Sequence, residues 1–335
     1  MNQIKVKLFS AEIYDETSFE KANENYNFII EYHKETLSLQ NVELTKNTDV
    51  VCVFVNDIIS QDLILKLYDN GVKMIALRCA GFNNVDISAA EGKIEVVRVP
   101  AYSPSSVAEY TLTMMLALNR KINKAYCRTR EGNFELHGLV GFNMKGKTVG
   151  IIGTGKIGQT LIPILKSLGM IVLAYDPIPD SDFAAKQDYK YVSLDEIYSK
   201  SDIISLHCPL NEKNYHLINK DAISEMKKGV MIINTGRGKL IDSKALIDGL
   251  KSGKIGFAGL DVYEEETDFF YHDFSDSVIE DDDLARLLSF GNVIVTSHQG
   301  YFTKEALKCI SETTLENIKL GIIDNLFPNK VITIE

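Results

Sequence analysis

The feature that most constrains this 335-residue chain is a glycine-rich turn near its middle. Gly153, Gly155 and Gly158 fit the pattern G-x-G-x-x-G, after the apolar segment 147–152 and before a stretch with helical periodicity. In that context the first glycine permits a tight turn, the second lets a pyrophosphate approach the backbone, and the third lets helix and strand pack closely. The pattern predicts a dinucleotide-binding α/β domain that begins well inside the chain.

Asp176 ends the next apolar segment, MIVLAYD, 18 residues after Gly158. A carboxylate at this position can accept hydrogen bonds from the adenosine ribose hydroxyls and repels a 2′-phosphate. No arginine or lysine occurs from Pro177 to Ala185, so no nearby cation would neutralise such a phosphate. These residues favour NAD over NADP as the cofactor.

Short apolar segments and amphipathic stretches alternate on both sides of residue 100, which is typical of parallel sheets covered by helices. The first series of expected strands is 4–10, 28–33, 50–55, 73–79 and 94–99, and the second is 147–152, 170–176, 202–208, 230–235, 255–263 and 292–297. An amphipathic helix at 305–324 is expected to pack on the first half. We therefore expect two doubly wound parallel-sheet domains. The expected arrangement is a Rossmann NAD-binding domain, residues 102–299, inserted into a flavodoxin-like substrate domain, residues 1–101 and 300–335.

Three further segments carry local expectations. Residues 105–131 are expected to form one long helix that connects the domains and faces a partner subunit. Pro163 lies within the helix after the glycine turn and is expected to kink it, because proline lacks the amide donor. The acidic stretch from Glu264 to Asp283 is expected to be an exposed loop.

Composition limits the possible partners. The formal net charge is −10 and no basic stripe occurs, which argues against nucleic acid or an anionic membrane. The polar first twenty residues do not resemble a signal peptide, and no apolar run is long enough to span a membrane. The five cysteines are scattered and form no C-x-x-C pair, so we expect reduced thiols in a cytoplasmic protein and no metal site.

Three polar residues follow expected strands of the second series: Arg237 after VMIINTG, Glu266 just beyond GLDVY, and His298 at the end of NVIVTS. Open parallel sheets bind ligands outside the carboxyl ends of their strands. Arginine pairs with a carboxylate through two hydrogen bonds, histidine exchanges protons near neutral pH, and a neighbouring carboxylate favours the imidazolium. Taken singly, each of the three residues could be a solvated charge. Taken together they fit hydride transfer to a 2-keto acid, because that reaction needs one group that binds the substrate carboxylate and another that donates a proton.

His207 is a rival to His298, because it also ends an expected strand, in ISLHCPL. We interpret His207 as a wall residue near the cofactor. The remaining histidines lie in polar or helical surroundings and are interpreted as surface residues: His33, His137, His216 and His272.

Eight separated motifs are distributed over essentially the whole chain: RCAGFNNVD (78–86), VRVPAYSP (97–104), AEYTLTMMLALNRK (108–121), VGIIGTGKIGQ (149–159), SLHCPL (205–210), MIINTGRGKLID (231–242), GLDVYEEE (259–266) and TSHQGYFTKEA (296–306). As a set they resemble the D-isomer-specific 2-hydroxyacid dehydrogenases and, within them, the fermentative D-lactate dehydrogenases. The spacing of 32 residues from Glu266 to His298 also resembles that branch. The resemblance implies NAD-dependent reduction of pyruvate to D-lactate, and it alone supplies the D stereochemistry.

The resemblance also implies a role for each matched residue. Arg237 would bind the substrate carboxylate and carbonyl, His298 would be the acid or base, and Glu266 would pair with His298. Ala80 and Gly81 would hold the carboxylate from the other domain, with Tyr102 as a pocket wall. The cofactor residues would be Gly153, Gly155, Lys156, Ile157 and Gly158 at the pyrophosphate, Asp176 at the ribose, Cys208, Pro209 and Asn214 on the adenosine side, and Thr235, Gly236 and Asp261 near the nicotinamide.

Two alternatives stay open. The same chemistry on a bulkier 2-keto acid differs only in pocket volume, and one methylene is worth only ~1–3 kcal/mol. The second alternative is an NAD-dependent transcriptional corepressor, in which the same fold serves as a protein-interaction module. The absence of long disordered tails argues against this alternative. The resemblance further implies a homodimer or homotetramer, with the reacting groups in an interdomain cleft.

Overall fold

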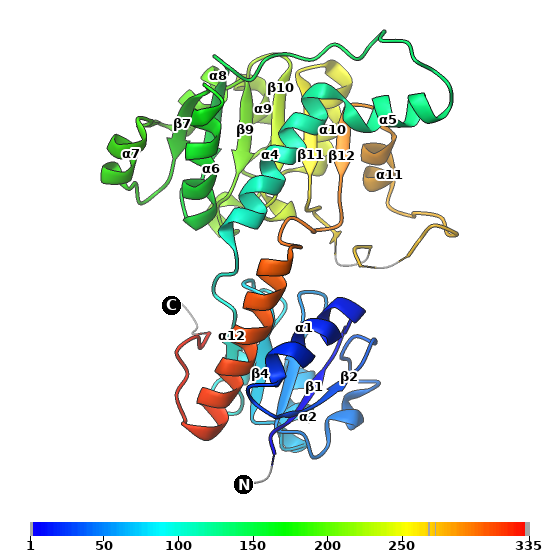
Figure 1. Cartoon of the computed structure of the whole chain (residues 1–335), viewed down its shortest axis with the longest axis vertical. Coiled ribbons are helices and arrows are strands. Elements are labelled where there is room, and N and C mark those ends of the chain that lie inside the picture. Colours follow the sequence, from blue (N-terminus) through cyan, green and yellow to red (C-terminus); the bar gives the residue numbers. More distant parts are fainter. Residues whose placement is uncertain (1–2, 267–268, 272, 332–335) are drawn as a thin grey trace. The chain divides into compact units, whose positions relative to one another are not determined.

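The computed structural model describes residues 3–266, 269–271 and 273–331, and the chain forms two compact units (Figure 1). One unit consists of Met1–Ser103 and Phe302–Glu335, and the other of Pro104–Tyr301. Both boundaries fall two residues later than the sequence-based boundaries after 101 and 299. The first boundary coincides with Pro104, where a helix begins.

The first unit is a five-stranded parallel sheet in the order β2-β1-β3-β4-β5, the flavodoxin-like order. Its strands are β1 (Lys5–Leu8), β2 (Ile29–Tyr32), β3 (Val50–Val53), β4 (Met74–Leu77) and β5 (Glu95–Arg98). Its helices are α1 (Ile13–Asn23), η1 (Val42–Thr45), α2 (Gln61–Asp69), α3 (Ile87–Ala90) and α12 (Lys304–Ile323). Helix α12 packs beside α1, where Leu315 and Ile318 join the core around Leu8 and Phe19. The last helix therefore returns to the first half of the chain, as predicted.

The second unit is a seven-stranded parallel sheet in the order β12-β11-β10-β9-β6-β7-β8. Its strands are β6 (Thr148–Ile152), β7 (Ile171–Tyr175), β8 (Lys190–Tyr191), β9 (Ile203–Leu206), β10 (Val230–Asn234), β11 (Ile255–Leu260) and β12 (Val293–Val295). Its helices are α4 (Pro104–Arg120), α5 (Ile122–Arg130), α6 (Lys156–Ser167), α7 (Ser181–Gln187), α8 (Leu194–Lys200), η2 (Glu212–Asn214), α9 (Lys220–Glu225), η3 (Gly238–Leu240), α10 (Ser243–Ser252) and α11 (Asp282–Ser289). Counted from β6, this is the Rossmann order, and the strand order reverses between β6 and β9. The predicted fold class is confirmed.

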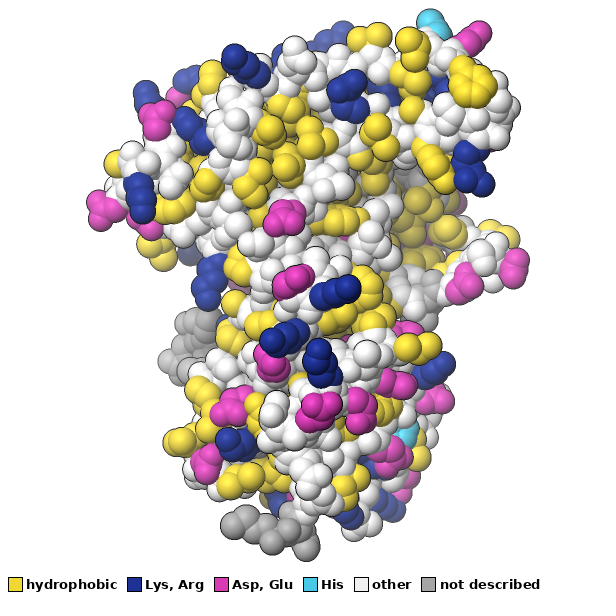
Figure 2. All heavy atoms as spheres, in the orientation of Figure 1, with side chains coloured by type: hydrophobic (Ala, Val, Ile, Leu, Met, Phe, Trp, Pro, Cys, Tyr) yellow, Lys and Arg dark blue, Asp and Glu magenta, His cyan; other side chains and the backbone are white. Residues whose placement is uncertain are grey.

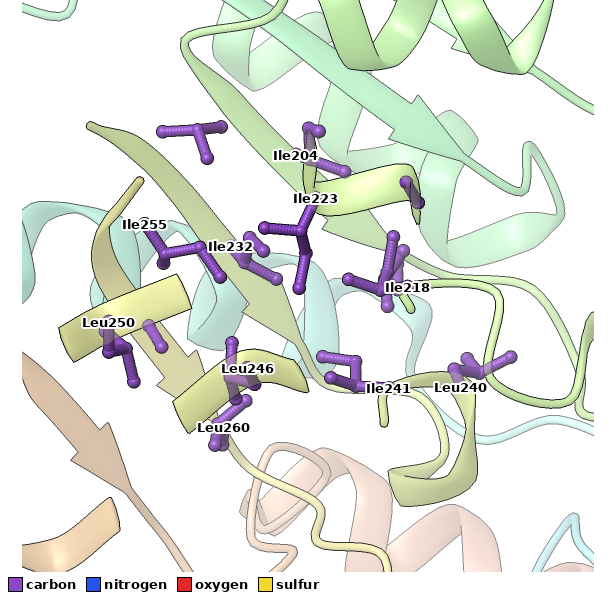
Figure 3. Close-up of a cluster of buried hydrophobic side chains, with 14 of the residues drawn as sticks. Ile204, Ile218, Ile223, Ile232, Leu240, Ile241, Leu246, Leu250, Ile255 and Leu260 are labelled. Atoms are coloured by element: carbon purple, nitrogen blue, oxygen red, sulfur yellow. The ribbon is translucent and has the colours of Figure 1, made fainter. Parts of the chain in front are cut away.

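A large apolar cluster fills one face of the second sheet (Figure 3). Ile204 and Ile232 point from the strands toward Ile223 and Leu246, which come from α9 and α10. Leu240 belongs to the same cluster and lies three residues after Arg237. Burying an aliphatic side chain contributes ~1.5–3 kcal/mol to the free energy of folding. The packing therefore stabilises the strands and helices from which the loops at the carboxyl edge of the sheet extend.

Three local expectations need correction or completion. The expected helix over 105–131 is two helices, because Lys121 between α4 and α5 adopts a left-handed conformation with φ of 50°. Helix α6 runs from Lys156 to Ser167 with Pro163 inside it, and the expected kink stays a prediction. The acidic stretch is not simply exposed, because Phe270 is buried and Phe269 packs against the large cluster. Its Thr267, Asp268 and His272 lie outside the described residues.

Candidate active site

The glycine turn after β6 has the geometry that a dinucleotide requires. Gly153 has φ of 97°, and a Cβ there would lie 2.5 Å from the Cys208 nitrogen. A Cβ on Gly158 would collide with the Gly153 carbonyl, whereas one on Gly155 would meet nothing within 4 Å. The first and third glycines are therefore required by the fold. The second leaves open space before Lys156, where α6 begins and its free amides and dipole favour an anion.

Asp176, directly after β7, is held in place by this turn. Its Oδ2 accepts from the backbone nitrogen of Thr154 at 2.7 Å, and its Oδ1 accepts from the nitrogen of Ile178 at 2.9 Å. The Thr154 hydroxyl lies 2.7 Å from the hydroxyl of Tyr191 on the edge strand β8. The sequence did not single out Tyr191, because β8 has only two residues and no periodicity to reveal it.

The loop after β10 presents Arg237 on a rigid backbone. The buried Asn234 side chain donates to the Arg237 carbonyl at 2.8 Å and accepts from the Gly236 nitrogen at 3.0 Å. The Arg237 guanidinium donates to the Gly236 carbonyl at 2.7 Å, and the hydroxyl of Thr235 lies 3.0 Å from that of Thr111 on α4. Asn234 was missed by sequence reasoning, although a lone amide at the end of a buried strand was the available signal.

His298 and Glu266 meet as predicted. The His298 Nδ1 lies 2.9 Å from the Glu266 Oε1, and the Glu266 Oε2 accepts from the Tyr263 nitrogen at 3.0 Å. Both side chains keep partial exposure, 15% for His298 and 22% for Glu266. Since Nδ1 faces the carboxylate, Nε2 is the nitrogen that remains for a reacting molecule.

The backbone of His298 is held in the left-handed region, with φ of 52°. Such a conformation costs a non-glycine residue roughly 1–3 kcal/mol and persists only when its surroundings impose it. The buried Asp261 imposes it here: its carbonyl accepts from the His298 nitrogen at 2.7 Å, and its carboxylate accepts from Thr296, Gln299 and Gly300 at 2.7–2.9 Å. Burial raises the pKa of Asp261, and these donors act against that rise.

Each glutamate of the run 264–266 has its own basic partner on a different loop. Glu264 lies 2.6 Å from Nε2 of His216, Glu265 lies 3.7 Å from Nζ of Lys239, and Glu266 pairs with His298. The third glutamate, selected by resemblance, is thus the one that contacts His298.

His207 has different surroundings from His298. Its Nε2 lies 2.9 Å from the Ser205 hydroxyl, and burial lowers the pKa of His207 to about 4. It is therefore neutral near pH 7 and is a poor proton donor. Among the other histidines, His33 and His216 are half-buried, which corrects the expectation of surface positions, while His137 is exposed.

The remaining candidate residues divide between the two units. In the second unit, Asn214 donates to the Pro209 carbonyl at 2.6 Å, and burial raises the pKa of Cys208 to about 11. In the first unit, Ala80 accepts from Arg98 at 2.7 Å, and the Gly81 carbonyl accepts from the Cys79 thiol at 3.2 Å. Tyr102 is half-buried.

A Rossmann unit with a glycine turn, a carboxylate after its second strand and a histidine–carboxylate pair defines an oxidoreductase of the dinucleotide-binding type. Residues 112–300 match the family "D-isomer specific 2-hydroxyacid dehydrogenase, NAD binding domain". The chain therefore belongs to the D-isomer specific 2-hydroxyacid dehydrogenases, and NAD is the cofactor of this domain.

Relatives match over nearly the whole chain. A 2-hydroxyacid dehydrogenase homolog of Haemophilus influenzae is 52% identical over 94% of this chain and 95% of its own. The D-lactate dehydrogenase of Escherichia coli is 49% identical over 98% of this chain and 100% of its own. A solved structure titled as the pyruvate reductase of Chlamydomonas reinhardtii has a TM-score of 0.92 and 43% identity, covering 98% of each chain.

Proposed function

We propose that this protein catalyses the reversible reduction of pyruvate to D-lactate, with NADH as the hydride donor. The observation that carries the proposal is the His298–Glu266 pair at 2.9 Å on the carboxyl edge of an NAD-binding sheet that also presents Arg237. The name of the E. coli relative, D-lactate dehydrogenase, supports the choice of pyruvate.

In the proposed reaction, Arg237 holds the substrate carboxylate through its planar fork of donors and polarises the carbonyl. When bound, NADH supplies a hydride, which adds to the carbonyl carbon. His298 gives its Nε2 proton to the carbonyl oxygen, and Glu266 stabilises the imidazolium through Nδ1. In the reverse direction His298 takes the hydroxyl proton. The left-handed backbone at His298, fixed by Asp261, keeps the imidazole oriented for both directions.

The cofactor contacts form the second part of the proposal. Gly153, Gly155, Lys156, Ile157 and Gly158 would hold the pyrophosphate, Cys208, Pro209 and Asn214 the adenosine side, and Thr235, Gly236 and Asp261 the nicotinamide end. Asp176 would accept from the ribose hydroxyls. Asp176→Ser should lower the preference for NADH over NADPH by about tenfold, since it removes the charge that repels a 2′-phosphate. Unchanged selectivity would assign this discrimination to another group.

Ala80, Gly81 and Tyr102 of the first unit are proposed as further substrate contacts. Backbone amides suit a carboxylate, and the carbonyl of Ala80 is already engaged by Arg98. Tyr102→Ala should raise KM for pyruvate more than it changes KM for NADH. An equal change in both constants would remove Tyr102 from the substrate site.

The test of the substrate is a steady-state comparison of pyruvate, phenylpyruvate and 2-ketoisocaproate, with the enantiomer of each product determined. The proposal expects the highest kcat/KM for pyruvate and a D product. A preference for the bulkier acids would favour the alternative substrate class. Intact NADH binding without turnover of any keto acid would favour the interaction module instead.

We further propose a cytoplasmic homodimer or homotetramer. Figure 2 shows hydrophobic side chains gathered over α4 and α6, and the segment after α5 exposes Phe134, Leu136 and Val140 at 76%, 79% and 84%. An exposed apolar surface of this kind is typical of a partner contact.

In a separate observation, no helix in the described ranges meets the length and apolarity needed to cross a membrane. Light scattering of wild type and Leu136→Glu tests the assembly, which the substitution should weaken.

A further inference from the structure

A second histidine–glutamate pair lies two residues from Glu266 and has no part in the proposed chemistry. The Nε2 of His216 lies 2.6 Å from the Oε1 of Glu264, and the side chains are only 26% and 16% exposed. The Glu264 Oε2 accepts from the Ser243 nitrogen at the start of α10 at 3.2 Å. The carboxylate of Glu264 is therefore bound at both oxygens to groups from two other segments.

His216 is itself fixed by its backbone. Its φ is 51°, its nitrogen donates to the Lys239 carbonyl at 2.9 Å, and its ring stacks on that of Tyr215 with centroids 4.0 Å apart. Two residues later, the nitrogen of Ile218 donates to the Leu240 carbonyl at 3.0 Å. Two backbone hydrogen bonds therefore join the segment 215–218 to the loop that follows Arg237.

The loop of Arg237 also touches the glutamate run directly. A side chain at Gly238 would collide with the carbonyl of Tyr263, so glycine is required for this close approach. Three loops consequently meet at Glu264: the segment after β9, the loop after β10, and the turn after β11 that carries Glu266.

We propose that Glu264 and His216 are a positioning pair for the reaction. The pair holds the turn of Glu266 so that its carboxylate reaches His298, and it ties that turn to the segment that carries Asn214. The inference rests on the proposed function, because it assigns Glu264 an effect exerted through Glu266. A misplacement of about 1 Å at a reacting group can cost on the order of 100-fold in rate.

Glu265 supplies a matched control in the same turn. Its contact with Lys239 is longer, 3.7 Å, and the two side chains are 58% and 43% exposed. Exposed pairs of this kind contribute little. Glu265→Ala should therefore leave kcat within about twofold of wild type. Glu264→Ala removes the same charge, but from a side chain that is hydrogen-bonded at both carboxylate oxygens.

The experiment measures kcat with pyruvate and the Kd of NADH for Glu264→Ala, Glu265→Ala, Glu266→Gln and the double variant of Glu264→Ala with Glu266→Gln. We expect Glu264→Ala to lower kcat about tenfold in the wild-type background and less than twofold in the Glu266→Gln background, because both changes act on one group. In Glu264→Gln the amide oxygen can still accept from the Ser243 nitrogen while the amide nitrogen donates to Nε2 of His216 in its Nδ1-protonated tautomer, so this variant should recover most of kcat. His216→Ala should weaken NADH binding several-fold, through the segment of Asn214.

Three results would overturn the inference. Equal losses from Glu264→Ala in the two backgrounds would show that Glu264 acts independently of Glu266. A loss no larger than that of Glu265→Ala would show that the pair is not needed. If Glu266→Gln itself left kcat unchanged, the proposed role of Glu266 would fail, and the inference with it. Should Glu264→Ala not fold, His216→Asn in the same two backgrounds decides the question.

Discussion

His207 and His298 both follow strands of the same parallel sheet, yet the groups beside their rings differ. His207 lies against Ser205, and burial lowers its pKa to about 4. His298 lies against the carboxylate of Glu266 and keeps partial exposure on a strained backbone. A histidine at the end of a strand is therefore not a proton donor by position alone; the group beside its ring decides.

Removing the Glu266 carboxylate from beside His298 should lower kcat more than a change at Asp261 or His207. Glu266→Gln keeps the size of the side chain but removes its charge, so the imidazolium loses its partner. We expect kcat for pyruvate to fall by about 100-fold, within the range of acid–base contributions. The check is steady-state kinetics at saturating NADH. A fall of less than threefold would mean that His298 works without the carboxylate.

Asp261→Asn should have an intermediate effect. One carboxylate oxygen of Asp261 accepts from the Gly300 nitrogen and the other from Thr296 and Gln299. An amide group cannot accept at both positions, so one donor is left unpaired and the loop of His298 relaxes. We expect about a tenfold loss of kcat with a lower Tm, measured by kinetics and thermal unfolding. An unchanged kcat with a lower Tm would limit Asp261 to stability.

His207→Asn should have the smallest effect on turnover, because a neutral His207 gives no proton; we expect kcat within about threefold of wild type. Its effect is instead on acid stability. The pKa of His207 is about 4 in the folded protein and 6.5 for an ordinary exposed histidine, so the unfolded chain binds more protons between these pH values. His207 therefore lowers folded stability progressively as the pH drops from 6.5 to 4.

The measurement for His207→Asn is urea unfolding at several pH values from 4 to 7. The loss of stability on acidification should be smaller in the variant than in wild type. An equal loss in both proteins would show that folding does not lower the pKa of His207.

The sequence predicted the sheets better than the loops. Strands such as β9 and β10 are buried along their whole length, so apolar runs marked them, whereas β8 has two residues and no such run. The break at Lys121 was missed because a left-handed residue within an amphipathic pattern leaves the apolar spacing nearly intact.

For the candidate site, residue type and position after a strand were enough to nominate Arg237 and His298. The run of three glutamates was not resolvable by pattern, since each residue has the same chemistry. Only the fold separates Glu264, Glu265 and Glu266, by bringing a different basic side chain to each. Asn234 and Tyr191 were not predicted for a related reason. Each acts through a hydrogen bond, Asn234 to the Arg237 carbonyl and Tyr191 to the Thr154 hydroxyl, and such contacts cannot be inferred from a single sequence.

The most direct test of the account compares wild type with His298→Gln in two assays on the same samples. The chain has no tryptophan, so the Kd of NADH can be followed by the fluorescence of the nicotinamide. Reduction of pyruvate should fall by about 1,000-fold, since glutamine cannot supply the proton, while the Kd changes by less than twofold. Retained reduction, or an equal loss of reduction and NADH binding, would contradict the assignment of His298 as the acid.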